Sequence, residues 1–357
     1  IPSRIMLLGE APHESDFRLH QPLTSYGGVE LNKLLQEAGI MRSECYATYV
    51  CKTLPPGGQL SNLIATKKKD IAAAHVLLKG QYVLPQVVQG YEELMKEIAM
   101  VQPNIIVALG SIALWALTGK WGAAKWRGSL LMMDGQQIKV IPTLHPLALT
   151  KQFELRGVIL NDLKRVKRHM VSRTYDNKLT WKFIIRPNFS QVMDILNTLF
   201  TRVAGGEEVW LDFDIETRYR HMDCVGFSWS RTEAICIPLI TRGKPEGYWS
   251  LDEEAAIVFA CYRLFTHSNI HCRWQNGLYD AQYIFRHWHF IPRHGQDTMI
   301  TQHSLFAAMP KGLAFLASMY ADWYVYWKDE GKIASDVPEE QRWIYNLQDC
   351  VYTRECG

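Results

Sequence analysis

The segment LDFDIET, residues 211–217, alternates apolar and acidic side chains along its length. Alternate residues of a β-strand share one face, so Leu211, Phe213 and Ile215 are predicted to enter a core while the acids line the other face. Clustered carboxylates repel one another, and burying them without partners is costly. The segment is therefore either a strand with a solvated polar face or one wall of a cation site.

The chain has 357 residues, of which 48% are hydrophobic and 21% charged, so it can form two domains with real cores. The net charge of +3 is too small to indicate nucleic-acid binding by itself. Two basic runs, residues 67–69 and 164–169, are either patches that contact phosphates or solvated helix ends.

The eight cysteines include no Cys-x-x-Cys pair, which argues against disulfides and structural zinc and favours a reducing compartment. The longest apolar run, residues 105–117, is too short to span a bilayer, so we expect a cytoplasmic protein without membrane partners. The sequence shows no signal peptide and stops at Gly357 within a helical pattern. We therefore expect it to be part of a longer protein.

Strand and helix patterns alternate through the first half of the chain. The expected strands are residues 4–8, 104–110 and 139–149, the last running into a loop, and the expected helices are residues 29–40, 91–101 and 111–119. This alternation predicts a three-layer α/β/α domain over residues 1–165. In such sheets the chemistry lies in loops at the carboxyl ends of the strands.

A polar, basic stretch without clear periodicity, residues 166–181, is predicted to be a linker. A second α/β domain is predicted over residues 182–357. Its first strand is expected at residues 209–217, and residues 224–230 and 234–240 favour the next two strands of an antiparallel meander. This meander would feed a mixed sheet, and residues 276–357 are expected to be mostly helical.

Further acids stand in two downstream segments. Asp280 opens an expected helix four residues after Asn276. Tyr345 and Asp349 are also four apart, so they share one face of a helix that is expected to start near Pro338. Taken singly, Asp280 could be an ordinary acid at a helix start, and the other two an exposed polar face.

The order D-x-E, N-x-x-x-D and Y-x-x-x-D resembles the tyrosine subgroup of the DEDD 3′–5′ proofreading exonucleases, over roughly residues 180–357. Residues 225–239 and 297–320 are similar to the version of this domain in family A DNA polymerases. The resemblance implies a ribonuclease-H-like mixed sheet and two divalent cations, Mg²⁺ or Mn²⁺. It implies metal ligation by Asp214, Glu216, Asp280 and Asp349, orientation of the attacking water by Tyr345, and binding of the primer end by Asn276. Asp212 lies outside the motif and is interpreted as an accessory acid or an edge residue.

Five short motifs in the first half occur in an order that resembles the family 4 uracil-DNA glycosylases, across most of residues 1–165. They are residues 9–16, 26–40, 46–56, 105–110 and 143–149. The resemblance implies that Glu10 orients water and that His145 stabilises the departing uracil anion. Alternatively, Glu10 bonds backbone amides of its loop and His145 is a hydrogen-bonded loop residue.

The same region departs from the family at its base pocket. Leu23 stands where the family has a stacking phenylalanine, Tyr49 where it has the asparagine that reads uracil, and His13 where it has a glycine. With only Cys45 and Cys51 in this region, no iron–sulfur cluster is expected. We therefore expect a retained fold that handles DNA, with base excision lost or shifted to a modified pyrimidine.

The order of the two domains resembles the N-terminal half of a group of bacteriophage DNA polymerases. It implies the proofreading part of a DNA-directed DNA polymerase used in replication in the cytoplasm of an infected bacterial cell. The implied partners are the single-stranded 3′ end of a primer–template, a C-terminal polymerase domain and processivity or replisome proteins. Two alternatives remain: an active uracil or modified-pyrimidine glycosylase of base excision repair with an accessory nuclease, and a non-catalytic DNA-binding module.

Overall fold

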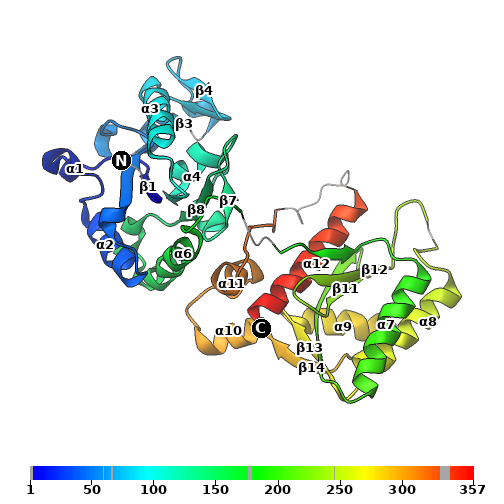
Figure 1. Ribbon diagram of the computed structural model, residues 1–357. Coiled ribbons are helices and arrows are strands. Elements are labelled where there is room, and N and C mark those ends of the chain that lie inside the picture. Colours follow the sequence, from blue (N-terminus) through cyan, green and yellow to red (C-terminus); the bar gives the residue numbers. More distant parts are fainter. Residues whose placement is uncertain (1–2, 59, 66, 176–178, 245, 330–337) are drawn as a thin grey trace. The chain divides into compact units, whose positions relative to one another are not determined.

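The computed structural model describes the whole chain except residues 1–2, 59, 66, 176–178, 245 and 330–337 (Figure 1). It divides into two compact units, Ile1–Asn177 and Lys178–Gly357. Each unit has its own sheet and its own buried cores.

The first unit is built on a five-stranded sheet in the order β2-β1-β6-β8-β7. Its strands are β1 (Ile5–Gly9), β2 (Cys45–Tyr49), β6 (Ile105–Leu109), β7 (Leu131–Met132) and β8 (Lys139–Thr143). All neighbours pair in parallel except β7 and β8. Every residue of β6 is buried, as expected for a parallel strand that is covered on both faces. The prediction of a buried parallel strand is confirmed.

Helices cover this sheet. They are α1 (Glu14–Leu19), α2 (Tyr26–Glu37), α3 (Pro85–Val101), α4 (Ser111–Thr118), α5 (Ala123–Trp126) and α6 (Arg156–His169). Met6 and Ile106 of the sheet share one core with α3 and α4, and α6 packs against β6 and β8. A small antiparallel sheet adds β3 (Ile64–Ala65), β4 (Val76–Leu78) and β5 (Gln81–Val83). The α/β prediction for this half is confirmed.

The start of the predicted linker is wrong, because residues 166–169 belong to α6. Val158, Ile159, Leu163 and Val166 are buried at helical spacing, so the apolar stripe of the helix continues into the stretch that looked polar. The basic residues that follow end the helix, where positive charge is favoured by the helix dipole. Part of the predicted linker, residues 176–178, lies outside the described residues.

The second unit has a six-stranded mixed sheet in the order β14-β13-β10-β11-β12-β9. Its strands are β9 (Lys182–Ile184), β10 (Val209–Arg218), β11 (His221–Ser228), β12 (Glu233–Pro238), β13 (Ile270–Trp274) and β14 (His294–Asp297). The strands β10, β11 and β12 form an antiparallel meander, while β13 and β14 run parallel to β10. The predicted mixed sheet, fed by an antiparallel meander, is confirmed.

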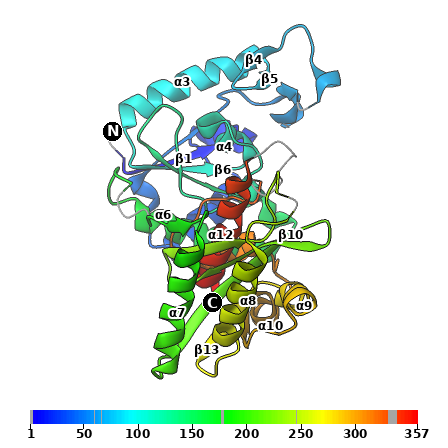
Figure 2. The same cartoon turned by 90° about the vertical axis from the view of Figure 1, so that its right-hand side faces the viewer.

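Six helices are described in this unit: α7 (Phe189–Ala204), α8 (Leu251–Phe265), α9 (Gly277–Trp288), α10 (Thr298–Leu305), α11 (Leu313–Tyr320) and α12 (Glu339–Cys356). The neighbouring helices α7 and α8 lie side by side (Figure 2). Their apolar faces share a core with β10, whereas α12 packs on a second cluster formed by Cys224 of β11 and Cys236 of β12. The sheet therefore lies between two helical layers.

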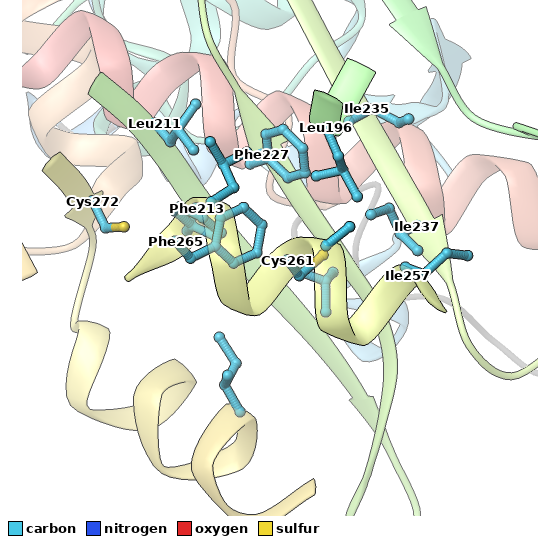
Figure 3. Close-up of a cluster of buried hydrophobic side chains, with 14 of the residues drawn as sticks. Leu196, Leu211, Phe213, Phe227, Ile235, Ile237, Ile257, Cys261, Phe265 and Cys272 are labelled. Atoms are coloured by element: carbon cyan, nitrogen blue, oxygen red, sulfur yellow. The ribbon is translucent and has the colours of Figure 1, made fainter. Parts of the chain in front are cut away.

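The alternation in β10 places its apolar residues as predicted. Leu211 and Phe213 are buried in the core on the side of α7 and α8 (Figure 3). Ile215 is buried in the same core. The Phe213 ring stacks on Trp274 with a centroid distance of 4.8 Å and meets Phe265 edge to face at 4.7 Å. Because neighbouring side chains of a strand point to opposite faces, the acids of β10 point toward α12.

Within the described parts of the chain, no helix combines the length and the apolar character needed to cross a bilayer.

Candidate active site

The structure brings together the acids that the sequence singled out in the second unit. Asp214 and Glu216 lie on β10, and Asp280 lies in the first turn of α9. Tyr345 and Asp349 come from one face of α12, which follows Pro338 directly. Asp280 Oδ1 accepts a hydrogen bond from the backbone nitrogen between the two acids of β10, at 2.9 Å. One strand and two helices thus supply the cluster.

The electrostatics of this cluster favour the neutral forms of its acids. Burial raises the pKa of Asp214 well above its ordinary range, and the nearby carboxylates of Asp349, Glu216 and Asp280 raise it further. Burial also raises the pKa of Glu216 and of Asp280 to about 7. The cluster holds more negative charge than its surroundings offset, which is the condition that a bound cation relieves.

A lysine that sequence reasoning missed contacts this cluster. Lys328 Nζ forms an ion pair with Asp349 Oδ2 and donates a hydrogen bond to the Tyr345 hydroxyl at 2.9 Å. Trp327 Nε1 donates to the other oxygen of Asp349, at 2.6 Å. Both oxygens of Asp349 are therefore engaged by residues from the segment that follows α11. No periodic pattern in that segment signals this contact.

Two more residues of α12 hold the acids of β10. Asn346 Nδ2 donates to the carbonyl oxygen of Asp214 at 2.9 Å and to its Oδ2 at 2.8 Å. Arg342 Nη2 donates to the backbone oxygen of Thr217 at 2.6 Å and lies 3.4 Å from Glu216 Oε2. Their positions, three and seven residues before Asp349, put them on the face of the helix that carries the motif. That spacing could have identified them.

Asn276 lies at the N-terminus of α9, with a left-handed backbone at φ 63°. Asparagine adopts this conformation more readily than most residues. Its backbone nitrogen donates to Asp297 Oδ1 at 3.2 Å, and the neighbouring Gly277 nitrogen donates to Oδ2 of the same residue at 2.8 Å. Asp297 therefore fixes the turn that presents both Asn276 and, one turn later, Asp280.

The donor set of the cluster fits a hard divalent cation, because carboxylate oxygens are the ligands that Mg²⁺ and Mn²⁺ prefer. As the described side chains stand, however, no three histidine, cysteine, aspartate or glutamate residues are grouped closely enough to coordinate one ion. In the first unit, Cys45 begins β2 and Cys51 follows its end, so the strand separates the two thiols.

In the first unit, Glu10 and His145 follow the carboxyl ends of parallel strands β1 and β8. Glu10 Oε1 accepts a hydrogen bond from the Ile112 nitrogen at 3.0 Å, so it caps α4, and burial raises its pKa. His145 Nδ1 accepts a hydrogen bond from the Leu147 nitrogen at 3.3 Å. Burial lowers the pKa of His145 to about 4, which keeps the ring neutral at pH 7 with an N–H donor at Nε2.

Tyr49 fills the space beside these residues. Its hydroxyl donates to Asp16 Oδ2 at 2.7 Å and accepts a hydrogen bond from the Leu23 nitrogen at 2.6 Å. Both Tyr49 and Leu23 are buried, and a Cβ atom at Gly9 would lie 2.8 Å from the tyrosine ring. Tyr49 stands at the position of the family's base-reading asparagine, and its hydroxyl is therefore already hydrogen-bonded within the protein.

Asp16 is a residue of the first unit that the sequence did not single out, although it stands three residues after His13. His13 is the N-cap of α1, and Asp16 completes a capping box by accepting from the His13 nitrogen at 2.7 Å. Burial alone would raise the pKa of Asp16, but hydrogen bonds from His13, Thr24 and Tyr49 lower it overall. The His13 side chain is exposed and bonds only locally in the contacts described.

Three solved structures resemble the C-terminal half. The catalytic core of RRP6 from Trypanosoma brucei is 14% identical, with a TM-score of 0.36, and the match covers 51% of this chain and 47% of that one. RNase D from Escherichia coli, an exoribonuclease, is 15% identical with a TM-score of 0.34, covering 48% and 42%. NrnC from Brucella melitensis is 15% identical with a TM-score of 0.35, covering 50% and 79%. This chain spans less than half of the first two, and likeness at this level assigns no activity.

A longer sequence match is to the DNA polymerase of Bacillus phage SP01. It is 24% identical over 218 residues, which are 60% of this chain and 21% of that polymerase. An alignment of this length exceeds either compact unit, so it includes residues of both. The chain is thus a homologue of a phage DNA polymerase.

The first unit matches a family over nearly its whole length. The profile of the Uracil DNA glycosylase superfamily matches residues 1–164. A type-4 uracil-DNA glycosylase from Thermotoga maritima is 32% identical over 171 residues, 47% of this chain and 78% of that protein. Another, from Pyrobaculum aerophilum, is 28% identical over 166 residues, 44% of this chain and 74% of that protein. Through its N-terminal half, this chain belongs to the uracil DNA glycosylase superfamily, with type-4 glycosylases among its relatives.

Proposed function

We propose that the second unit is a 3′–5′ exonuclease that hydrolyses the terminal nucleotide of a DNA strand. The observation that supports this most strongly is the convergence of four carboxylates from β10, α9 and α12 beside one lysine. The four acids have only Lys328 and Arg342 as cationic side-chain partners in the contacts described, and the excess negative charge is costly to bury. A site that binds divalent cations accounts for the excess.

The residues that would hold two Mg²⁺ or Mn²⁺ ions are Asp214, Glu216, Asp280 and Asp349. Bound there, the ions would stabilise the charge on the attacking and leaving oxygens of an in-line phosphoryl displacement. Tyr345 lies one helical turn from Asp349, so its hydroxyl would orient the attacking water. Asn276, which is fixed at the start of α9 by Asp297, would bind the primer end.

This proposal predicts degradation that depends on magnesium and proceeds from the 3′ end. A 5′-labelled single-stranded DNA oligonucleotide incubated with the chain and Mg²⁺ should give a ladder of products shortened one nucleotide at a time. The ladder should be absent when Mg²⁺ is replaced by EDTA, because four carboxylates without cations would repel the phosphate. An oligonucleotide that stays intact in Mg²⁺ and in Mn²⁺, or that is cut internally, would contradict the proposal.

We infer that the first unit contacts DNA without excising uracil. Glycosylases flip a base into a pocket and read its edge by hydrogen bonds. Here the Tyr49 hydroxyl donates to Asp16 and accepts from the Leu23 nitrogen. Leu23 has no ring on which a base could stack, and Tyr49 has no amide with which to read the base edge. Exposed residues of the two basic runs, residues 67–69 and Lys164, Lys167 and Arg168, supply positive charge for phosphate contacts.

The first unit is therefore expected to leave uracil in place. An oligonucleotide with one central uracil, incubated without metal and then treated with alkali, should show no break at the uracil. A type-4 uracil-DNA glycosylase run in parallel serves as the positive control. A single alkali-labile break at the uracil would overturn the inference and favour a repair enzyme with an accessory nuclease. Glu10 and His145 both stand where the glycosylase family has its functional residues, so uracil excision is worth testing as a second function.

The parent of this chain is, in this proposal, a phage DNA-directed DNA polymerase in which the second unit proofreads. The match to the polymerase of Bacillus phage SP01 supports this reading, since it includes residues of both units. The partners would be a primer–template, the polymerase domain of the same parent and processivity or replisome proteins, in the cytoplasm of an infected host. Binding of DNA without any cleavage would instead favour a non-catalytic binding module.

A further inference from the structure

Lys328 places a positive charge inside the proposed metal site. Its ammonium pairs with Asp349 and donates to the Tyr345 hydroxyl, and it acts electrostatically on Asp214 and Glu216 of β10. Its side chain is only 25% exposed, and that of Asp349 is 8% exposed. The ammonium therefore contacts one proposed metal ligand directly and lies close to two others.

The backbone that presents this lysine is anchored firmly. Trp327, the preceding residue, is buried, stacks on Tyr352 of α12 with a centroid distance of 4.0 Å, and donates to Asp349 Oδ1. Tyr324 meets the same Tyr352 ring edge to face at 6.1 Å. Aromatic packing thus fixes the segment on α12: Trp327 belongs to the packed core, and the half-buried Lys328 extends from the residue beside it.

The four carbons of a lysine side chain allow its ammonium to move while the backbone stays in place. Trp327 and Lys328 each take one acceptor site on Asp349, so they compete with a cation for this carboxylate. A divalent ion would add two positive charges beside the ammonium, and the like charges would repel. Metal binding and the present position of Lys328 therefore oppose each other.

We propose that Lys328 is an internal counter-ion that occupies the place of a divalent cation in the metal-free exonuclease site and must withdraw when the cation binds. The lysine offsets the repulsion among the carboxylates, which stabilises the site before metal arrives. It also lowers the affinity for metal, because each ion must displace it. This inference rests on the proposed exonuclease function.

The test is metal binding without DNA, in which no turnover is needed. Free Mn²⁺ is measured by electron paramagnetic resonance during titration of the full chain, its Lys328→Met and Lys328→Gln variants, and an Asp214→Asn variant. Both neutral replacements of the lysine should bind Mn²⁺ roughly tenfold more tightly than the wild type. In the metal-free state they should also melt at a lower temperature, and Mg²⁺ should raise that temperature more than it does for the wild type.

A matched control removes a lysine that pairs with a carboxylate elsewhere. Lys182 of β9 lies 3.7 Å from Glu233 and is mostly exposed, so Lys182→Met should leave Mn²⁺ affinity unchanged. Equal or weaker Mn²⁺ binding by both Lys328 variants, with binding still lost in Asp214→Asn, would overturn the counter-ion role and leave the exonuclease proposal standing. Absence of Asp214-dependent binding in every protein would overturn both proposals.

Discussion

Replacing Asp214 with asparagine should lower the rate of magnesium-dependent 3′ degradation by about a thousandfold or more, equivalent to about 4 kcal/mol of transition-state stabilisation. Asp214 lies on the central strand of the cluster, next to the carboxylates of Glu216, Asp280 and Asp349. Asparagine removes one negative charge where two cations would be held. The loss should appear in the turnover number more than in DNA binding, because the cations that the carboxylate would hold act on the reacting phosphate.

The fold should survive this substitution. Asparagine has nearly the volume of aspartate, and its side-chain oxygen can still accept from Asn346 Nδ2, which lies 2.8 Å from Asp214 Oδ2. Burial raises the pKa of Asp214, which means that its charge costs folding free energy near pH 7, so the melting temperature should not fall.

Initial rates on a 5′-labelled single strand, measured beside melting curves, check both expectations. The control is Asp252→Asn, which removes an exposed acid from the first turn of α8 and should leave the rate unchanged. An Asp214→Asn variant that folds and keeps more than a tenth of the wild-type rate would exclude Asp214 from metal binding.

The residues that the sequence could identify are those whose spacing reflects local geometry. The period of two in residues 211–217 predicted which side chains of β10 enter the core, and Leu211, Phe213 and Ile215 do so. The spacing of four between Tyr345 and Asp349 predicted a shared helical face. Both patterns follow from the repeat of one element, so they need no knowledge of the tertiary structure.

Contacts between distant segments could not be predicted in this way. Lys328 reaches Asp349 only because Trp327 packs on α12, and its own segment has neither helical nor strand periodicity. Tyr49 meets Leu23 through a left-handed backbone at Leu23, with φ 60°. A non-glycine residue rarely adopts the left-handed conformation, and the residues around Leu23 give no pattern that predicts it. In both cases the side chain was visible in the sequence, but its partner was not.

One of the two interpretations of Asp212 is wrong. Because β10 lies between β11 and β13, Asp212 is not an edge residue of the sheet, whereas its role as an accessory acid stays a prediction. Its side chain is fully buried and forms ion pairs with two arginines: Arg273 Nη1 lies 2.8 Å from Oδ1, and Arg354 pairs with Oδ2. Arg273 comes from β13 and Arg354 from α12. The third acid of the motif strand therefore joins the sheet to the helix that carries the site.

The energetics of this cluster are asymmetric. Burial raises the pKa of Asp212 although both guanidinium groups lower it, so desolvation outweighs the pairing. A buried ion pair of this kind adds little stability relative to apolar residues of the same size. Removing only the carboxylate is different, because two largely buried arginines, with side chains 12% and 22% exposed, would lose their counter-charge.

We therefore expect Asp212→Ala to destabilise the second unit by about 3 kcal/mol, at the low end of the range for buried pairs because both arginines retain some contact with water. Calorimetry of the whole chain should show one transition lowered by roughly 6–12 °C and the other unchanged. Asp194→Ala, which removes an exposed acid of α7, should change stability by less than about 0.5 kcal/mol.

Below the lowered transition, Asp212→Ala should retain magnesium-dependent exonuclease activity, since Asp212 is held by arginines and lies outside the proposed metal ligands. A loss of activity without a loss of stability would instead place Asp212 among the catalytic residues.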